Sequence, residues 1–414
     1  MKIAIVGAGV SGLTAAYILS REHTVTLYES QERLGGHAHT VKVPGGDGDY
    51  WVDTGFLVYN ENTYPYFIEL MRQLDIPTKP TVMSFSYRNL STGLEWKGSN
   101  LNTVFGQRRN ILRPRFWRMV LDILAFNRHL RETLAGPADS GETLAQLLAK
   151  KGWSQEFRDW YLRPMGASIW SANPEKFTNM PARSFAEFFS RHGLLQVKNQ
   201  PKWRTIDGGS RLYVEKILDV LRERSVAVVH EAVTSVARNE TVRVATVSGT
   251  ETFDHVVMAC HSNEALALLS DPTPAEKEIL GAIAYQDNEV TLHTDESLLP
   301  RLRRTWAAWN YQDDPAVSDR ATLTYNISTL QSIDAPRQFL VSLNSQHAID
   351  PEKVLRRFTY AHPVLDDITV AAQSRQSELH TELTSFCGAY LGFGFHEDGA
   401  RSAVQVCERF GLHL

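Results

Sequence analysis

The stretch Ile3-Ala4-Ile5-Val6-Gly7-Ala8-Gly9-Val10-Ser11-Gly12 decides the fold of this chain. Four apolar residues run directly into three glycines spaced as GxGxxG, and an alanine-rich stretch with helical character follows. A second apolar run, Val25-Thr26-Leu27-Tyr28, comes next and ends in Glu29. This order, with an acid about 20 residues after the glycines, predicts a βαβ unit that binds a dinucleotide.

Each residue of this motif has a distinct predicted role. Gly7 allows the tight turn, Gly9 lets the backbone approach a pyrophosphate, and Gly12 lets helix and strand pack closely. The helix that opens at Ser11 directs its N-terminal amides at the phosphates. Glu29 accepts hydrogen bonds from ribose hydroxyls, which argues against a 2′-phosphate there. The alternative is an ordinary strand-to-helix turn, and the strand before the glycines and the acid after them argue against it.

The residues after Glu29 decide which cofactor is expected. The segment Glu29-Ser30-Gln31-Glu32-Arg33-Leu34-Gly35-Gly36 adds an arginine and a second glycine pair. A nicotinamide enzyme with this fold has no general need of a second glycine turn, whereas an extended FAD benefits from another close backbone approach. This segment resembles the ExxxRxGG signature of the FAD superfamily that includes amine oxidases, phytoene desaturases and protoporphyrinogen oxidases. The resemblance implies FAD, with contacts from Ser30, Arg33, Gly35 and Gly36.

Four further residues are expected beside the cofactor. The superfamily usually continues with arginine after the glycine pair, and here His37 takes that place, where it can donate to a phosphate or lie near the flavin. A DxG turn at Asp53-Thr54-Gly55-Phe56 is similar to one that brings backbone next to the isoalloxazine ring, so Gly55 and Phe56 are candidate flavin neighbours. In related flavoproteins the strand around Val233 lies beside the adenine.

The last motif is Phe386-Cys387-Gly388-Ala389-Tyr390-Leu391-Gly392-Phe393-Gly394-Phe395-His396-Glu397-Asp398-Gly399. We expect a strand to end at Cys387, Gly388 and Ala389 to form a tight turn, and a helix to begin near Glu397. This arrangement looks like the C-terminal FAD turn of the amine oxidase superfamily. Helix N-terminal amides stabilise negative charge, so His396, Glu397 and Asp398 would lie beneath the pyrimidine edge of the flavin. A glycine-rich C-terminal hairpin is the alternative.

The length of 414 residues exceeds one typical core and predicts two domains. The expected class is α/β, an FAD-binding Rossmann-like (GR2-type) domain with an inserted α+β substrate domain. The FAD-binding domain is discontinuous and comprises residues 1–59, 201–263 and 364–414. Helical periodicity dominates 60–200 and β segments dominate 264–363, and these two parts form the substrate domain. The β segments are expected at 290–293, 305–309, 321–325 and 339–343.

Composition fits a soluble enzyme, with 43% hydrophobic and 22% charged residues. A net charge of −4 gives no reason to expect nucleic acid as a partner. No apolar run approaches the ~18 residues of a membrane span. The three cysteines, Cys260, Cys387 and Cys407, lack metal-ligand spacing, so no metal site is expected, and free thiols favour a reducing cytoplasm. None of them compels a covalent flavin link, so FAD is expected to bind noncovalently.

A narrower resemblance covers the whole chain. GGHAHT at 35–40, YNENTYP at 59–65, SIWSA at 168–172, HTD at 293–295 and YAHP at 360–363 recur, together with the C-terminal motif, in a bacterial family of NAD/FAD-binding flavoproteins. Members of that family are associated with cyclopropane-type fatty acyl methyltransferases, and some desaturate methylated acyl chains on the way to furan fatty acids. The resemblance implies a lipid acyl chain or another hydrophobic small molecule as substrate, and an acyl methyltransferase as partner.

The chemistry expected is hydride transfer from an activated C–H bond to flavin N5 in a dry pocket between the two domains. His362 and His396 are candidates for proton handling, because histidine titrates in the useful range. Tyr59 is predicted to act with His362 in catalysis, and Trp170 and Tyr360 to line an apolar channel with it. The alternatives are histidines satisfied by the structure and aromatic packing in a core.

The segment Gln107–Arg131 gives a hint about location. It carries seven arginines and one acid, Asp122, among apolar and aromatic residues, and Phe116, Val120 and Leu124 share one helical stripe. A basic amphipathic helix of this kind can lie on anionic lipid, so we hypothesise peripheral contact with the inner face of the membrane. The alternative is a helix of the substrate domain with a solvated basic face.

Three functions remain open at this stage. The first is an FAD dehydrogenase or desaturase of a lipid acyl chain. The second is a flavin amine oxidase, which needs an aromatic cage for the amine. The third is a flavin-binding partner that assists an acyl methyltransferase without redox turnover.

Overall fold

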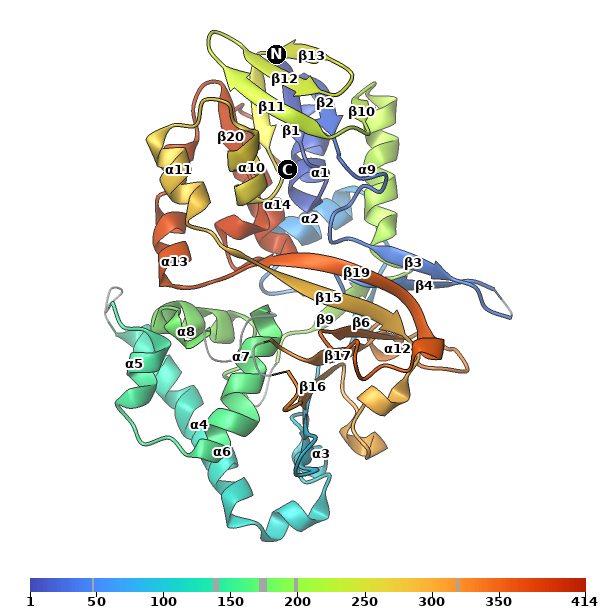
Figure 1. Ribbon diagram of the computed structural model, residues 1–414, viewed down its shortest axis with the longest axis vertical. Helices are drawn as coiled ribbons and strands as arrows, with labels where there is room; N and C mark the ends of the chain where they lie inside the picture. The colour runs from blue at the N-terminus through green and yellow to red at the C-terminus, as the bar shows by residue number, and fades with distance from the viewer. Residues whose placement is uncertain (47, 137–140, 171–176, 197–199, 318–319) are drawn as a thin grey trace.

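A five-stranded parallel sheet holds the two ends of the chain together. The computed structural model describes residues 1–46, 48–136, 141–170, 177–196, 200–317 and 320–414 (Figure 1). The sheet has the strand order β10-β2-β1-β14-β20, and every neighbouring pair is parallel. Its members are β1 (Lys2–Val6), β2 (Thr24–Tyr28), β10 (Ala227–Val229), β14 (His255–Met258) and β20 (Thr384–Phe386).

Alternate residues of the central strand β1 enter two different cores. Ile3 and Ile5 pack against helices, whereas Ala4 and Val6 pack against a small antiparallel sheet. The first face therefore carries α1 (Val10–Leu19), α2 (Pro65–Gln73), α9 (Arg211–Glu223) and α14 (His396–Glu408). The second carries β11 (Val233–Arg238), β12 (Val242–Thr246), β13 (Thr250–Phe253), α10 (Ser262–Leu268), α11 (Pro274–Gly281) and part of α13 (Asp367–Ser374). This three-layer arrangement is the predicted nucleotide-binding domain.

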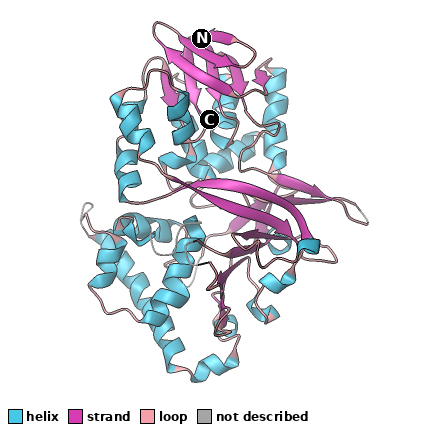
Figure 2. Cartoon of the chain, viewed as in Figure 1, coloured by secondary structure: helices cyan, strands magenta, loops and turns pink. Residues whose placement is uncertain are grey.

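A seven-stranded sheet forms the second part of the molecule, in the order β19-β15-β18-β17-β16-β7-β8. The two long strands β15 and β19 cross the middle of the molecule and separate the nucleotide-binding domain from the helices below (Figures 1 and 2). The strands are β7 (Phe85–Asn89), β8 (Glu95–Lys97), β15 (Tyr285–His293), β16 (Trp309–Asp313), β17 (Leu323–Asn326), β18 (Leu340–Leu343) and β19 (Val354–Pro363). Short strands complete the β structure: β3 (Thr40–Val43), β4 (Tyr50–Asp53), β5 (Tyr59–Asn60), β6 (Thr78–Thr81) and β9 (Trp203–Ile206).

Helices dominate between β8 and β9, as predicted. They are α3 (Leu101–Val104), α4 (Pro114–Ala135), α5 (Leu144–Ala149), α6 (Gln155–Phe157), α7 (Arg163–Trp170) and α8 (Ala182–Arg191), and α12 (Ile327–Leu330) lies further along the chain. Aromatic side chains such as Phe126, Phe157 and Phe185 are fully buried between these helices. Part of the SIWSA motif, residues 171–172, lies outside the described residues. No described helix is both long and apolar enough to span a membrane.

Two expectations about the secondary structure of the substrate domain are wrong. Residues 78–97 form β6, β7 and β8 rather than helix, because Phe85 and Tyr87 pair with β16 and bury their side chains in the core. The strand expected at 305–309 begins only at Trp309, after a 3-10 turn at Arg303–Thr305. Helix α2 packs in the core of the nucleotide-binding domain although its sequence position lies in the predicted substrate part. The domain boundaries stay a prediction.

Candidate active site

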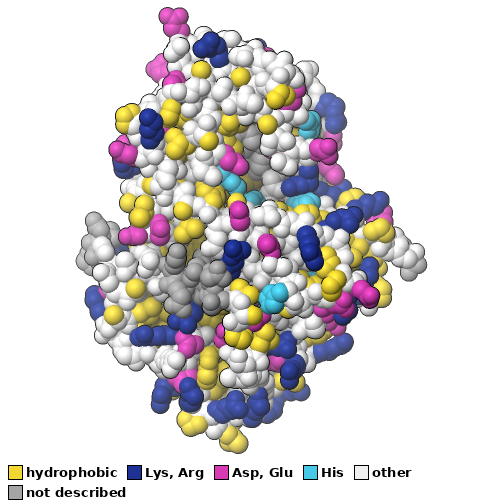
Figure 3. All heavy atoms as spheres, in the orientation of Figure 1, with side chains coloured by type: hydrophobic (Ala, Val, Ile, Leu, Met, Phe, Trp, Pro, Cys, Tyr) yellow, Lys and Arg dark blue, Asp and Glu magenta, His cyan; other side chains and the backbone are white. Residues whose placement is uncertain are grey.

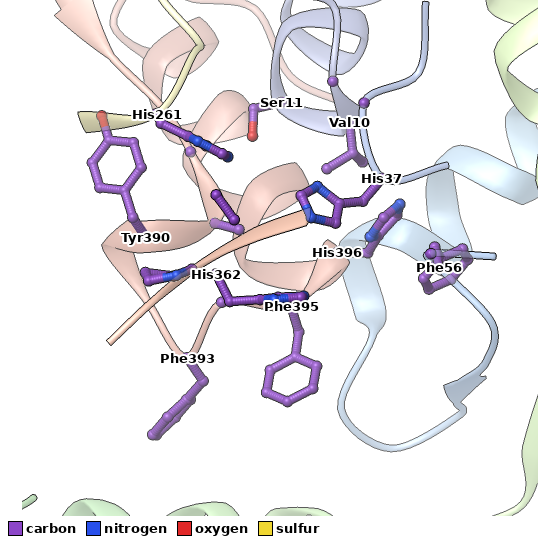
Figure 4. A pocket seen from close by; sticks show the side chains of 18 of the residues that line it. Val10, Ser11, His37, Phe56, His261, His362, Tyr390, Phe393, Phe395 and His396 are labelled. Carbon is purple, nitrogen blue, oxygen red and sulfur yellow. The ribbon is translucent and has the colours of Figure 1, made fainter. Parts of the chain in front are cut away.

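A cavity of about 810 Å³ lies where the two domains meet. Its wall takes residues from both ends of the chain, from strands β15, β16, β17 and β19, and from helices α7 and α8. In Figure 4, side chains from the N-terminal turn, from β19 and from the C-terminal motif surround one central space. Gly399 of α14 stands so close to α1 that a Cβ there would lie 2.6 Å from Val10 and 2.9 Å from the Ser11 hydroxyl. The two termini therefore build one site.

The N-terminal glycines leave room for a ligand at the end of β1. Gly7 adopts a φ of +104°, and a Cβ on Gly12 would lie 1.8 Å from the Gly7 carbonyl oxygen. A Cβ on Gly9, in contrast, would meet no protein atom within 4 Å, because that position faces the cavity. Gly36, with a φ of +57°, would place a Cβ 3.0 Å from the Cα of Gly9. The two glycine turns thus pack on each other and expose backbone to the cavity.

Most of the residues predicted to contact the cofactor line this cavity. They are Gly7, Gly9, Ser11, Glu29, Ser30, Gly36, His37, Gly55, Phe56, Val233, Gly388, Ala389 and His396. The predicted catalytic residue His362 lines it as well. The structure does not place Gly12, Arg33, Gly35, Glu397, Asp398 and Tyr59 on the wall. Which of these residues touches a bound cofactor stays a prediction.

Arg33 and the two acids of the C-terminal motif support the wall from behind. The Arg33 guanidinium donates to the carbonyl oxygens of Leu34, Gly36 and Ala38, which fixes the second glycine turn. Glu397 accepts hydrogen bonds from two backbone N–H groups at the start of α2, those of Tyr66 and Phe67.

Asp398 holds the other side of the C-terminal turn, where it accepts from the N–H groups of Phe393 and Phe395 and pairs with Arg401. Burial raises the pKa of Glu397 to about 7. Arg33, Glu397 and Asp398 therefore shape the site through their hydrogen bonds to backbone groups.

Tyr59 is a correction to the prediction. Its side chain is 3% exposed and packs against Tyr64 and Phe67 in the core of the nucleotide-binding domain. Tyr59 is not part of the cavity wall. We therefore assign Tyr59 to the core. Tyr360 also lies behind the wall, where its hydroxyl bonds His39 Nδ1 at 2.8 Å and the Thr54 hydroxyl at 2.9 Å, whereas Trp170 lines the cavity as predicted.

His362 is held in one tautomer by a chain of amides. Asn344 Oδ1 accepts from the Glu289 N–H, so Asn344 Nδ2 donates to Asn288 Oδ1 at 2.8 Å. Asn288 Nδ2 then faces His362 Nδ1 at 3.0 Å, and Nδ1 must accept. The proton of neutral His362 therefore sits on Nε2, where no described residue accepts it. Burial lowers the pKa of His362 to about 4, so at neutral pH it is a hydrogen-bond donor rather than a base.

His192 has the opposite tautomer. The sequence did not predict a role for it in the site. Its Nδ1 lies 3.0 Å from the Phe188 carbonyl oxygen, which accepts a proton but cannot give one. The proton is therefore on Nδ1, and Nε2 keeps its lone pair. His192 lines the cavity from the end of α8 and stacks on Phe188 with 3.9 Å between ring centroids. Burial lowers its pKa to about 4, so the ring is neutral at neutral pH, and the tautomer leaves the Nε2 lone pair facing outward from the Phe188 carbonyl oxygen.

His396 is less free than the sequence suggested. Its Nε2 bonds the Tyr213 hydroxyl at 3.2 Å, and its ring stacks on Phe56 with centroids 3.8 Å apart. Burial lowers its pKa to about 3. The ring is therefore fixed as a neutral part of the wall, which fits a cofactor contact better than proton transfer.

Comparison with known proteins places the chain in a family. A family model described as flavin containing amine oxidoreductase matches residues 10–321. The chain belongs to this family. Among curated relatives, the 15-cis-phytoene desaturase of Synechococcus elongatus is 36% identical over 108 residues, which make up 26% of this chain and 19% of the desaturase. This membership confirms the FAD-dependent amine oxidase and desaturase superfamily that the motifs predicted, and the matched stretches span about a fifth of the length of the first curated relatives.

Solved structures confirm the predicted fold of this flavoprotein over nearly its whole length. Cyclohexylamine oxidase from Brevibacterium oxydans IH-35A superposes with a TM-score of 0.70 at 15% identity and covers 99% of both chains. The CLA-producing fatty acid isomerase from P. acnes has a TM-score of 0.67 at 15% identity and covers 99% of this chain and 98% of its own. At these identities the likeness concerns the fold.

The cavity residues of the flavoprotein fit FAD. The N-terminus of α1 points its free amides at the space beside Gly9, where a pyrophosphate is stabilised by the helix dipole. His37 Nε2 is buried without a hydrogen-bond partner among the described residues, although its ring lines the cavity. A buried polar atom of this kind requires a partner. A cofactor oxygen or nitrogen would supply it.

The end of the cavity away from the glycines is mostly apolar, with Ser84, His192 and Gln200 as polar residues among its lining. Its walls carry Met83, Phe85, Met165, Ile169, Trp170, Phe188, Leu194, Trp203, Trp309, Tyr325, Phe393 and Phe395. The described lining contains no aspartate, lysine or arginine, and its glutamates, Glu29, Glu231 and Glu264, all belong to the nucleotide-binding domain. The substrate end therefore has no charged side chain among the described residues.

Proposed function

We propose that the flavoprotein is a dehydrogenase or desaturase that takes a hydride from an activated C–H bond in a methylated or unsaturated fatty acyl chain of a lipid. The apolar substrate end of the cavity carries this proposal. Burying a charged substrate group against such walls costs several kcal/mol unless a partner compensates it. An acyl chain needs no such partner. Its removal from water is favourable in proportion to the apolar area buried.

Two resemblances support an acyl substrate. The motifs at 35–40, 59–65 and 360–363 recur in flavoproteins associated with fatty acyl methyltransferases. The fatty acid isomerase among the solved structures has the same fold, so this architecture is compatible with a fatty acid as substrate. Association with an acyl methyltransferase is part of this proposal.

The side chains of the cavity divide the proton chemistry between them. FAD, when bound, supplies the acceptor for the two electrons of the C–H bond. Forming a double bond also releases a proton from the neighbouring carbon, and the lone pair on His192 Nε2 is available to accept it. His362 presents an N–H that can hold an acyl carbonyl or a polar edge of the cofactor. The aromatic walls exclude water from the reacting bond.

A flavin amine oxidase is the competing function, and the family description favours it. Such an enzyme needs two aromatic rings that face each other across a gap. Trp309 and Tyr325 meet edge to face at the substrate end, with 5.6 Å between centroids and 88° between planes, so no amine fits between them. This contact supports the acyl substrate.

The test is anaerobic bleaching of the flavin absorbance in the purified holoenzyme. Phospholipid with monounsaturated or methylated acyl chains should bleach the flavin, whereas primary and secondary amines should not. Bleaching by amines alone would identify an amine oxidase. No bleaching by either would favour the flavin-binding partner without redox turnover. The His192→Gln variant serves as the matched control, because it should keep the bound flavin and slow lipid-dependent bleaching.

A further inference from the structure

An exposed apolar patch lies on the helical part, away from the cavity. Six of the large hydrophobic side chains that are exposed lie between residues 101 and 124: Leu101, Ile111, Leu112, Trp117, Leu121 and Leu124. Leu112 is 86% exposed and Leu121 is 61% exposed. We call these six residues the apolar patch. Such a concentration of exposed apolar side chains within one short segment of the chain indicates an interaction surface.

Three elements carry the patch: α3 holds Leu101, the 3-10 turn before α4 holds Ile111 and Leu112, and α4 holds the other three residues. The 3-10 turn η1 (Arg108–Leu112) leads into α4, and the Trp117 indole N–H donates to the Ile111 carbonyl oxygen at 2.8 Å, which joins them. Along α4, Trp117, Leu121 and Leu124 follow the i, i+4, i+7 spacing of one helix face.

This face differs from the predicted stripe of Phe116, Val120 and Leu124. Phe116 is fully buried with Met119 and Phe126, so the opposite side of α4 packs into the core. The patch is therefore not a core face left uncovered.

Arginines surround the patch. Arg108, Arg109, Arg113 and Arg128 are exposed, and within the described part of the chain no carboxylate forms an ion pair with them. The one acid of the segment, Asp122, accepts hydrogen bonds from the backbone N–H and hydroxyl of Ser154. Figure 3 shows lysine and arginine side chains gathered over the lower end of the molecule with hydrophobic atoms at its tip, where Figure 1 places the start of α4. Arg108, Arg109 and Arg113 donate only to neutral carbonyl and amide oxygens, so their charges are not neutralised. Apolar side chains beside such cations match the interface of an anionic bilayer.

We propose that this surface docks the enzyme on anionic lipid, with Leu112, Trp117 and Leu121 inserted among the acyl chains and the arginines on the head groups. Helix α4 packs on α8, whose Phe188 lines the cavity, so one layer of helix separates the docked surface from the substrate end. Docking thus brings the cavity next to a source of apolar substrate. The docking itself does not depend on the proposed function, since it needs no turnover.

The test is co-sedimentation of the FAD-loaded enzyme with vesicles. Vesicles of phosphatidylcholine with about one third phosphatidylglycerol should carry the enzyme down, whereas pure phosphatidylcholine should not. Raising the salt from about 0.1 M to about 1 M should weaken binding, because the Debye length falls from about 10 Å to about 3 Å. The L112D/L121D variant should lose at least about tenfold in partitioning, and Arg113→Gln should lose about fivefold.

A matched control places two aspartates at exposed apolar positions outside the patch. Val247 and Ile368 are 83% and 60% exposed and lie outside the patch, so V247D/I368D should bind vesicles like the wild type. The proposal is overturned if the wild type stays in the supernatant with anionic vesicles, or if both double variants bind equally. It is also overturned if L112D/L121D only converts a dimer to a monomer by light scattering, because a second copy would then cover the patch. Failure of lipid to bleach the flavin would leave the vesicle result unchanged.

Discussion

The two ends of the cavity are built in different ways. At the nucleotide end, backbone makes the wall, and the glycines that expose it lie within 30 residues of one another in the N-terminal unit. At the substrate end, side chains make the wall, and they come from β7, β16, β17, α7, α8 and the C-terminal motif. The N-terminal glycine turns of the first end are specified by local sequence, and Gly388 and Ala389 from the C-terminal motif complete that end. The second exists only once distant elements have packed, and substitutions should separate the two.

The largest effect is expected at Gly12. A Cβ in Gly12→Ala would lie 1.8 Å from the Gly7 carbonyl oxygen, so helix α1 must move away from β1. We expect a loss beyond the ~1–3 kcal/mol of ordinary overpacking and no yellow protein after purification.

Gly9→Ala is the matched control, because its Cβ meets no protein atom within 4 Å. It should fold and yet bind FAD weakly. Circular dichroism, thermal unfolding and flavin content measure both results, and equal stability of the two variants would contradict the packing role of Gly12.

At the substrate end, His192→Gln should slow turnover and leave the flavin bound. Removal of a general base typically costs about 10²–10⁴-fold in rate. The effect should appear in the rate of anaerobic flavin reduction at saturating lipid, with FAD affinity unchanged. A His192→Gln variant that reduces its flavin at the wild-type rate would show that His192 only packs on Phe188.

A smaller effect is expected where the two ends meet, at the amides that orient His362. Asn288→Leu removes the donor to Nδ1 of His362 and one of the two acceptors of Asn344 Nδ2, which keeps its hydrogen bond to the Ala321 carbonyl oxygen. The unpaired Nδ1 costs about 1–3 kcal/mol, which corresponds to a loss of about ten- to a hundredfold if the orientation of His362 matters. Asn288→Asp is the informative partner, because a carboxylate would accept from Nδ1–H and so reverse the tautomer. Its pH profile of flavin reduction should differ from that of Asn288→Leu, and identical profiles would reduce Asn288 to a packing residue.

The nucleotide end could be predicted from the sequence because its determinants are local. Gly7, Glu29 and Gly36 lie close in sequence, and a glycine at each turn has few alternative explanations. His192 could not be predicted, because its role depends on the Phe188 carbonyl group four residues earlier and on a cavity that other elements form. The sequence indicates only that His192 follows an apolar helix that contains Phe188. The sequence around Asn288 gave even less indication of a role in the site. Its partner His362 lies 74 residues away and meets it only through the pairing of β15 with β19.

Glu397 gives a measurable pH dependence at the junction of α14 and α2. Burial raises its pKa from 4.5 to about 7, although the Tyr66 and Phe67 N–H groups favour the charged form. The folded chain therefore binds this proton more tightly than the unfolded chain between pH 4.5 and 7. The resulting stability is fully present below pH 4.5 and is lost as the pH rises through about 7.

Glu397→Gln removes this titration. Between the two ends of that pH window, the wild type should lose on the order of 1 kcal/mol more stability than the variant, with FAD saturating in both. Histidines that titrate in the same range are common to the two proteins and cancel in the difference. Parallel curves of unfolding free energy against pH would contradict the raised pKa.

The smallest effect is expected at Tyr59, which the sequence suggested for catalysis and the structure places in the core. Its ring packs on Tyr64 and Phe67, and it does not reach the cavity. Tyr59→Phe keeps the ring and should change stability by less than about 0.5 kcal/mol, with flavin reduction at the wild-type rate. A large loss of rate with unchanged stability would mean that the hydroxyl reaches the reacting atoms. Strand β5, which carries Tyr59 and belongs to neither the backbone end nor the aromatic end of the cavity, would then be part of its wall.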